Sequence, residues 1–284
     1  MRAIIVSVDY SDLLSITLPY NRHHFTDVCI VTAPHDTETQ RIALENSTAL
    51  HITKAFYANG AVFNKWAALE EGFDAFGRHG WTANMDADVL WPKDLLFSED
   101  AIGLQIGISD NPFLTNLAKG QLCTPRRRMW EDWPKLPIDL VDSMDFHLKG
   151  KSPFEPENLV AILPAESDWP QFPLHPQQQE FAGYTQIFHA EDPHLGPAPW
   201  HETNWKHAGG ADSFFQQKWP DECKIRPPFE VLHLGPAGQN WCGRATPLAD
   251  GTVPTESSER KAKLRNFIRG RVAGPNRFNG EKLL

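Results

Sequence analysis

The stretch from Trp81 to Pro92 constrains this chain more than any other part of its sequence. Alternating apolar and polar residues lead into Asp86 and Asp88, and Pro92 ends the run, which predicts a buried strand that leaves its sheet at the two carboxylates. In an extended Asp-x-Asp both side chains lie on the same face, about 7 Å apart, so they can share one divalent cation. A second interpretation, in which both carboxylates are solvated loop residues, stays open.

Length and composition indicate one large domain with appendages. The chain has 284 residues, of which 41% are hydrophobic, so it can bury a substantial core. It contains no run of eighteen apolar residues, and its beginning, Met1 to Asp9, is typical of a first strand and not of a signal peptide. We therefore expect no transmembrane segment and a cytoplasmic location.

The cysteines show no Cys-x-x-Cys spacing, which favours free thiols in a reducing compartment. A structural zinc site that uses some of them together with histidines is left open by the sequence. The four cysteines are Cys29, Cys123, Cys223 and Cys242.

The first hundred residues alternate between strand and helix patterns. Residues 3–9 and 27–33 are rich in β-branched side chains, which predicts buried parallel strands, and residues 51–53 predict a shorter third strand. Between these and the Asp-x-Asp, apolar residues recur at helical spacing from Val62 to Phe76, which predicts an amphipathic helix. This order predicts a doubly wound α/β sheet, in which ligands bind at the carboxyl ends of the strands.

Two common phosphate-binding motifs do not occur in the sequence. No Gly-x-Gly-x-x-Gly follows the first strand, and there is no Gly-x-x-x-x-Gly-Lys-Ser/Thr. The first absence disfavours a dinucleotide-binding fold and the second a P-loop nucleotidase. A phosphorylated ligand would therefore be held through a metal ion.

Residues from about 103 to 180 are rich in proline and tryptophan, and we interpret them as an irregular insertion, followed by a strand at 181–188. Within the insertion, Arg126–Arg128 has two interpretations: a contact to phosphate or nucleic acid, or a solvated turn with one internal salt bridge.

Two later segments hold further candidate site residues. Gly209 and Gly210 would let the backbone approach a ligand closely, and Asp212 follows them in the first turn of a predicted short helix. Asp212 either acts on the ligand or caps that helix. His233 ends a predicted strand at 229–236, where it is either a hydrogen-bonded residue or an additional ligand of a manganese site.

Taken together, six segments resemble the GT-A fold glycosyltransferases, of the kind often encoded by bacteriophages. The resemblance covers residues 2–100 and 180–245. It implies a GT-A-like, Rossmann-like mixed sheet flanked by helices in residues 1–253, with the insertion at 103–180. The segments are Ile4–Tyr10, Thr32–Thr37, Phe63–Lys65, Asn84–Pro92, Gly209–Asp212 and Val231–Gly235.

The resemblance also implies a role for each candidate. Asp86 and Asp88, with His233 as a further ligand, would hold Mn²⁺ or Mg²⁺ against the diphosphate of a nucleotide sugar, most commonly a UDP-sugar. Asp212 would be the general base of an inverting displacement, although retention is open. The remaining donor contacts implied are Asp9, Tyr10, Thr32, Asp36, Asn64, Lys65, Gly209 and Gly210.

The C-terminal tail, residues 254–284, differs in charge from the rest of the chain. It carries eight Lys/Arg against three Asp/Glu, or +5, which leaves the first 253 residues at −14. Residues 258–271 predict a basic helix that could bind DNA phosphates. The resemblance to phage enzymes, some of which glycosylate hydroxymethylated bases in DNA, implies such a base as one acceptor. The basic residues expected at this surface are Arg260, Lys261, Lys263, Arg265, Arg269 and Arg271, together with Arg126–Arg128.

Other interpretations of the tail and of the whole chain stay open. The basic helix could dock on the acidic body of its own chain, or meet an anionic membrane where lipid or cell-wall glycans are made. The chain could also be a non-catalytic protein that binds nucleotide sugars or polyanions.

Overall fold

The computed structural model describes residues 1–109, 111–131, 133, 159, 163–174, 181, 183–209, 211–235, 240–244, 246–249 and 252. The predicted basic helix at 258–271 and the whole tail, residues 254–284, lie outside these residues. Among the described residues, no helix is long and apolar enough to cross a membrane.

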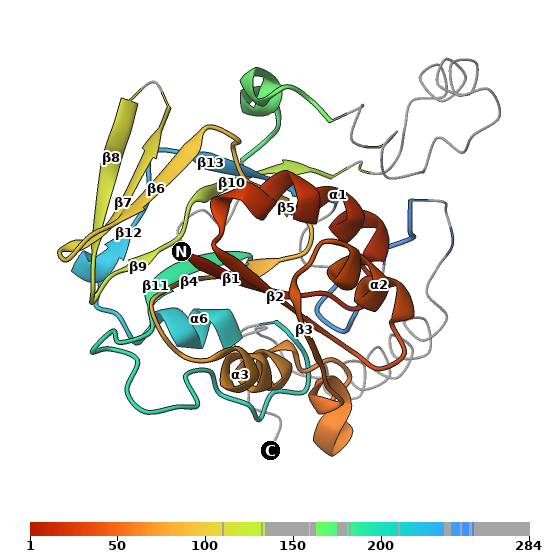
Figure 1. The fold of residues 1–284 in the computed structure, drawn as a ribbon. Coiled ribbons are helices and arrows are strands. Elements are labelled where there is room, and N and C mark those ends of the chain that lie inside the picture. Colours follow the sequence, from red (N-terminus) through yellow and green to blue (C-terminus); the bar gives the residue numbers. More distant parts are fainter. Residues whose placement is uncertain are drawn as a thin grey trace, which may run out of the picture.

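A seven-stranded mixed sheet forms the centre of the molecule, in the order β12-β9-β11-β4-β1-β2-β3 (Figure 1). Its four N-terminal strands are parallel, as predicted, and the chain crosses from β3 back to β4 on the other side of β1. This reversal creates a switch point between β1 and β4, where ligands of such sheets bind. The strands are β1 (Arg2–Val6), β2 (Asp27–Thr32), β3 (Ala49–Ile52) and β4 (Trp81–Asp86).

Helices cover both faces of the sheet, because side chains along each strand alternate between two apolar clusters. On β1, Ala3 and Ile5 pack with residues of α1 and α2, whereas Ile4 and Val6 pack with residues of α3 and α6. The predicted α/β class, with a mixed sheet flanked by helices, is thus confirmed. The helices are α1 (Ser11–Asn21), α2 (Thr37–Glu45), α3 (Lys65–Phe76) and α6 (Ala211–Gln216), with 3₁₀ helices η1 (Arg22–His24), η2 (Ala55–Gly60), η3 (Glu166–Gln171) and η4 (Asp221–Cys223).

The other half of the central sheet contains antiparallel pairings. β11 (Thr185–His189) runs antiparallel to β4, with Thr185 opposite Met85, and then pairs with β9 (Leu122–Cys123), beside which β12 (Lys224–Ile225) lies. An antiparallel neighbour begins where its partner ends, so the residues just before β11 lie beside the end of β4.

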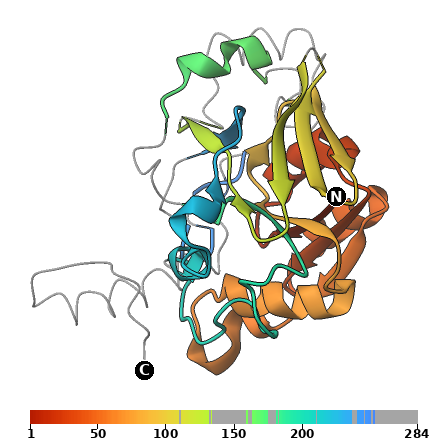
Figure 2. The ribbon, with the colours of Figure 1, turned by 90° about the vertical axis from the view of Figure 1, so that its left-hand side faces the viewer.

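Two small sheets complete the described fold. One joins β10 (Arg126–Trp130) and β13 (Glu230–Leu234) to β5 (Val89–Leu90), which follows the Asp-x-Asp directly. The other is antiparallel and stands to one side of the central sheet, as Figures 1 and 2 show. Its strands are β6 (Leu95–Glu99), β7 (Gly103–Ile108) and β8 (Asn111–Ala118).

The interpretation of residues 103–180 as irregular is wrong for its first part, which forms β7 to β10. In β7, Leu104 and Ile106 alternate with polar or small residues and are buried, which is the period-two pattern of a half-buried strand. Arg126–Arg128 lies in strand β10 and not in a turn, because β10 pairs in parallel with β13.

Candidate functional site

The Asp-x-Asp lies at the switch point between β1 and β4. Asp86 is the last residue of β4, and the chain turns at Ala87 and Asp88 before β5 begins. The strand therefore ends at Asp86, and Asp88 lies in the turn and not in an extended Asp-x-Asp. The exposed fraction of the side chain is 31% for Asp86 and 8% for Asp88.

Asp88 is a buried carboxylate that the small sheet brings next to His233. Pairing of β5 with β13 sets His233 opposite Val89, and the Leu234 N–H donates to the Asp88 carbonyl oxygen at 2.8 Å. Asp88 Oδ1 lies 3.6 Å from His233 Nε2 and has no hydrogen-bond donor among the described residues. The pairing of β5 with β13 thus places the imidazole of His233 beside the Asp88 carboxylate.

Burial shifts both groups toward their neutral forms. Burial, followed by repulsion from the Asp86 carboxylate, raises the pKa of Asp88 to about 7. Burial, followed by the positive charge of Arg127, lowers the pKa of His233 to about 3. The imidazole is therefore neutral near pH 7, the form in which histidine can bind a metal.

Asn64 and Lys65, both expected at the donor, have defined partners in the protein. The Asn64 carboxamide caps α3, accepting from the Ala67 N–H at 3.0 Å and donating to the Thr203 carbonyl at 2.7 Å. The Lys65 ammonium pairs with the Asp86 carboxylate and donates to the Gly183 carbonyl at 3.2 Å. Asn64 thus acts on helix α3, whereas Lys65 lies at the site itself.

Asp212 contacts the N–H of Gly183, whereas Lys65 contacts its carbonyl. The Oδ2 of Asp212 accepts a hydrogen bond of 2.8 Å from the Gly183 N–H. Asp212 therefore lies in the first turn of α6, as predicted, and also bonds to the segment before β11. Arg127 stacks on the Tyr184 ring at 4.4 Å, and the three carboxylates of Asp86, Asp88 and Asp212 act on its charge. Three carboxylates and two cations, Lys65 and Arg127, therefore share this site.

The arginines of 126–128 do not form one exposed surface. Only Arg126 is exposed, and Arg128 is paired with Glu230 through bonds of 2.5 Å from Nε and 3.3 Å from Nη2. The Arg127 guanidinium lies over the Tyr184 ring. The solvated-turn interpretation of Arg126–Arg128 is wrong, although Arg128 has the expected salt bridge, and a contact of these arginines with DNA phosphates stays a prediction.

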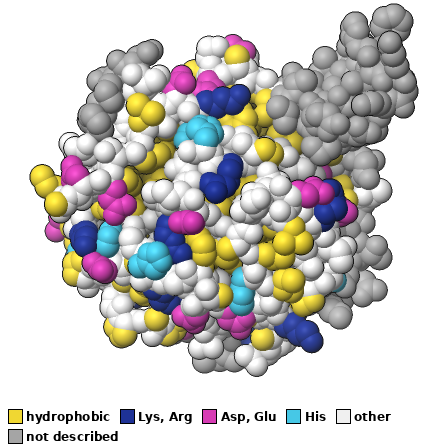
Figure 3. Space-filling model, viewed as in Figure 1, with side chains coloured by type: hydrophobic (Ala, Val, Ile, Leu, Met, Phe, Trp, Pro, Cys, Tyr) yellow, Lys and Arg dark blue, Asp and Glu magenta, His cyan; other side chains and the backbone are white. Residues whose placement is uncertain are grey.

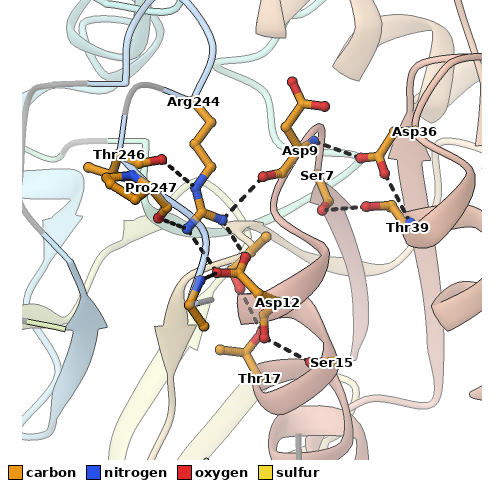
Figure 4. A network of polar contacts seen from close by, with 12 residues as sticks. Ser7, Asp9, Asp12, Ser15, Thr17, Asp36, Thr39, Arg244, Thr246 and Pro247 are labelled. Carbon is orange, nitrogen blue, oxygen red and sulfur yellow. Dashed lines mark hydrogen bonds and ion pairs between the residues drawn. The ribbon is translucent and has the colours of Figure 1, made fainter. Parts of the chain in front are cut away.

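The carboxyl ends of β1 and β2 are joined by Asp36. Asp36 caps α2, accepting from the Thr39 N–H at 3.0 Å, and also accepts from the Asp9 N–H at 2.7 Å (Figure 4). The hydroxyl oxygen of Thr32 lies 3.5 Å from Oδ2 of the same carboxylate. Asp9 has a positive φ of 61°, and its own carboxylate lies 3.4 Å from His35 Nε2. Asp36 and Thr32 thus hold the turn that presents Asp9.

Arg244 was not among the expected site residues, but hydrogen bonds hold it next to this turn. Its guanidinium forms a two-oxygen pair with Asp12 and donates at 3.1 Å to the Asp9 carbonyl, and it is 1% exposed (Figure 4). It also donates to the carbonyls of Thr246 and Pro247 at 3.1 and 2.7 Å. These bonds tie the segment around residue 244 to the start of α1.

Two further expected donor residues are packed against this C-terminal segment. The ring of Tyr10 lies 4.8 Å from the Arg244 guanidinium. A Cβ at Gly209 would lie 2.8 Å from the Trp241 ring. The close approach to the Gly209 backbone, which we expected from a ligand, is thus made by a tryptophan. Gly210 lies outside the described residues.

No group of three or more His, Cys, Asp or Glu side chains within the described part of the chain is arranged to hold a metal ion. Cys29, Cys123, Cys223 and Cys242 are free thiols. The assignment of Asp86, Asp88 and His233 as metal ligands stays a prediction.

No protein-family model matches this sequence, and no curated protein matches it significantly. Among solved structures, mannosyl-3-phosphoglycerate synthase from Rubrobacter xylanophilus is 14% identical, with a TM-score of 0.42, over 98% of this chain and 77% of that one. Glucosyl-3-phosphoglycerate synthase from Mycobacterium tuberculosis is 11% identical, with a TM-score of 0.38, over 97% and 81%. A complex of the latter enzyme with Mn²⁺, UDP and glucosyl-3-phosphoglycerate gives 12%, 0.39, 97% and 80%. At TM-scores below 0.5, the function has to be inferred from the site itself.

We predict that Arg244→Lys lowers the free energy of unfolding by about 3–5 kcal/mol, because lysine cannot replace the forked guanidinium and leaves Asp12 without its two-oxygen partner. Urea unfolding measures this. The matched control is Arg41→Lys, whose arginine is 53% exposed in pairs with Glu38 and Glu45, and which should change stability by less than about 0.5 kcal/mol. Equal effects of the two substitutions would contradict the clamp.

Proposed function

We propose that this chain is a metal-dependent glycosyltransferase that moves a sugar from a UDP-sugar to a hydroxyl acceptor. The observation that carries the proposal is the buried Asp88 Oδ1, which has no hydrogen-bond donor among the described residues and lies beside Asp86 at the end of a parallel strand. An ionised carboxylate buried without a partner costs several kcal/mol, so a bound cation at this position would be stabilising.

The side chains present fit a hard divalent cation. Carboxylate oxygens are the ligands that Mg²⁺ and Mn²⁺ prefer, and Mg²⁺ sites typically use one or two carboxylates and leave other positions to water and substrate phosphates. Asp86 and Asp88 would hold the ion, and the neutral His233 imidazole is the third candidate ligand. The ion held there would supply Lewis-acid stabilisation of the charge that develops on the leaving diphosphate.

Lys65 and Arg127 are the positively charged side chains at the proposed site. Lys65 pairs with Asp86, and the carboxylates of the site act on the charge of Arg127. Together with a divalent ion, these two cations would change the charge of the site from negative to positive, which would attract a diphosphate. For the nucleoside, we propose the turn at Asp9 and Tyr10, which Asp36 and Thr32 hold in place.

Asp212 is the proposed general base. The acceptor oxygen forms a bond to the anomeric carbon while the bond from that carbon to the diphosphate breaks, and the hydroxyl proton passes to the Asp212 carboxylate. One such displacement inverts the anomeric centre. The hydrogen bond from Gly183 supports this role, because it fixes the carboxylate at the site side of α6.

Metal-dependent nucleotide binding is the first test. Calorimetry should show UDP binding in Mn²⁺ that a chelator removes, and Asp88→Asn should weaken UDP binding in Mn²⁺ at least about tenfold, about 1.4 kcal/mol. Asp74→Asn, at a carboxylate that is 71% exposed on α3, is the matched control and should bind like the native chain. UDP binding that is insensitive to the chelator and to Asp88→Asn would overturn the metal site.

Turnover is the second test. With Mn²⁺ and a panel of UDP-glucose, UDP-galactose and UDP-N-acetylglucosamine, release of UDP to water reports transfer without a known acceptor. Asp212→Asn should lower kcat on the order of 10²-fold or more while the Kd for UDP stays within about threefold. Asp221→Asn, at an exposed carboxylate, is the matched control. Donor binding by the native chain without any turnover would favour a non-catalytic binding protein.

For the acceptor, we propose a hydroxymethylated base in DNA. Its support is the basic tail, residues 254–284, and the GT-A resemblance with phage enzymes. The face of the body viewed in Figure 3 has acidic and basic side chains interspersed, so this face of the described body does not add a basic surface to the tail.

Binding of double-stranded DNA in a salt series tests that acceptor. The native chain should lose affinity steeply between 50 and 200 mM salt, as about 0.9 counterions are released per neutralised phosphate, and a chain that ends at residue 254 should lose most of the binding. The truncated chain should still bind UDP in Mn²⁺. DNA binding that survives truncation would contradict the role of the tail, and transfer to a lipid or cell-wall glycan would then be the alternative to test.

A further inference from the structure

Two residues, Gly183 and Tyr184, contact charged residues from four separate elements of the site. Gly183 donates its N–H to Asp212 at 2.8 Å and accepts from Lys65 at 3.2 Å through its carbonyl. The Tyr184 carbonyl accepts from the Asp86 N–H at 2.9 Å, and the Tyr184 ring carries the Arg127 guanidinium at 4.4 Å.

Strand pairing explains why these two residues meet the others. β11 starts at Thr185 opposite Met85, so the two residues before it lie beside Asp86, where β4 ends. The Tyr184 hydroxyl donates to the Pro125 carbonyl, which fixes its ring beneath the first arginines of β10. The segment is therefore held from both sides, by β4 and by the chain entering β10.

Only glycine fits at position 183. A Cβ there would lie 2.7 Å from Trp66 Cη2 and 2.9 Å from the Cβ of Asp212, closer than real Cβ contacts. Trp66 is fixed, since it is 1% exposed, donates from its indole to the Ala208 carbonyl at 2.9 Å and stacks on His201 at 4.9 Å. A larger residue at 183 would therefore displace Asp212 rather than Trp66.

We propose that Gly183 is a positioning residue that sets the place of the Asp212 carboxylate relative to Asp86. Through its N–H it holds one oxygen of Asp212, and through its carbonyl it holds Lys65, whose ammonium pairs with Asp86. The inference rests on the proposed function, in which Asp86 lies on the donor side and Asp212 on the acceptor side. The separation of these two carboxylates then decides whether an acceptor hydroxyl meets both the anomeric carbon and its base.

Gly183→Ala tests the proposal. With the UDP-sugar that the native chain turns over fastest, kcat should fall about 10- to 100-fold, because a misplacement on the order of 1 Å costs about that much. The KM for the UDP-sugar and the Kd for UDP in Mn²⁺ should stay within about threefold, since the atoms nearest the added Cβ belong to Trp66 and Asp212 and not to Asp86 or Lys65. An unchanged kcat, or losses in donor binding equal to those in kcat, would overturn the proposal.

A steric control is available in α3. At Gly72 an added Cβ would lie 2.5 Å from Val31 Cγ2 and 2.9 Å from Ile4 Cδ1, an overlap like that at Gly183 but in the apolar core. Gly72→Ala should change the melting temperature and leave kcat within about threefold. A loss of kcat in Gly72→Ala as large as that in Gly183→Ala would show a general effect of packing and would overturn the proposal.

A double-mutant cycle separates this proposal from the proposed function. In the Asp212→Asn background, Gly183→Ala should lower kcat no further, because both changes remove the same base. Equal fold losses in both backgrounds would overturn the role of Gly183 and leave the role of Asp212 intact. Native kcat in Asp212→Asn alone would instead refute the general base.

A second variant covers the case that Gly183→Ala does not fold. Trp66→Phe removes the Cη2 that the new Cβ would meet but leaves the contact with the Cβ of Asp212. Trp66→Phe/Gly183→Ala should then fold with a kcat at least about tenfold below that of Trp66→Phe alone. Equal kcat values in these two variants would overturn the proposal.

Discussion

The antiparallel pairing of β11 with β4 is the constraint on which the site depends. It brings the chain before Thr185 to the end of β4, where Asp86 is the last strand residue. Without this pairing, Gly183 and Tyr184 would not reach Asp86, Lys65 would lose its bond to the Gly183 carbonyl, and Asp212 would lose its bond from the Gly183 N–H. A single pairing between strands that are 100 residues apart in sequence thus connects Asp86 to Asp212 through Gly183 and Tyr184.

The charges at this junction are balanced only in part. Asp86, Asp88 and Asp212 carry three potential negative charges, and Lys65 and Arg127 carry two positive charges. Burial makes the imbalance costly, which is why the pKa of Asp88 rises to about 7. In the proposed function, a bound cation and a diphosphate would offset this cost.

Local sequence patterns predicted the strands and helices well where the hydrophobic periodicity was strong. They predicted less well where packing between distant segments decides the structure. The helix predicted from Val62 to Phe76 begins at Lys65, because the Asn64 side chain caps it. The strands β7 and β8 were missed within a segment whose prolines and tryptophans suggested irregular structure. Arg244 was missed as well, because no local pattern marks an arginine whose partner, Asp12, is 232 residues away.

The sequence by itself determined that the parallel strands and α3 form and that two carboxylates follow a strand of the sheet, because side-chain periodicity and chain breakers act over a few residues. Only the tertiary structure decided which groups meet those carboxylates. His233 reaches Asp88 through the pairing of β13 with β5, Arg127 arrives on β10, and Gly183 arrives through β11. These contacts depend on strand register between distant segments, which is set by burial of whole faces and turn geometry and not by the local sequence.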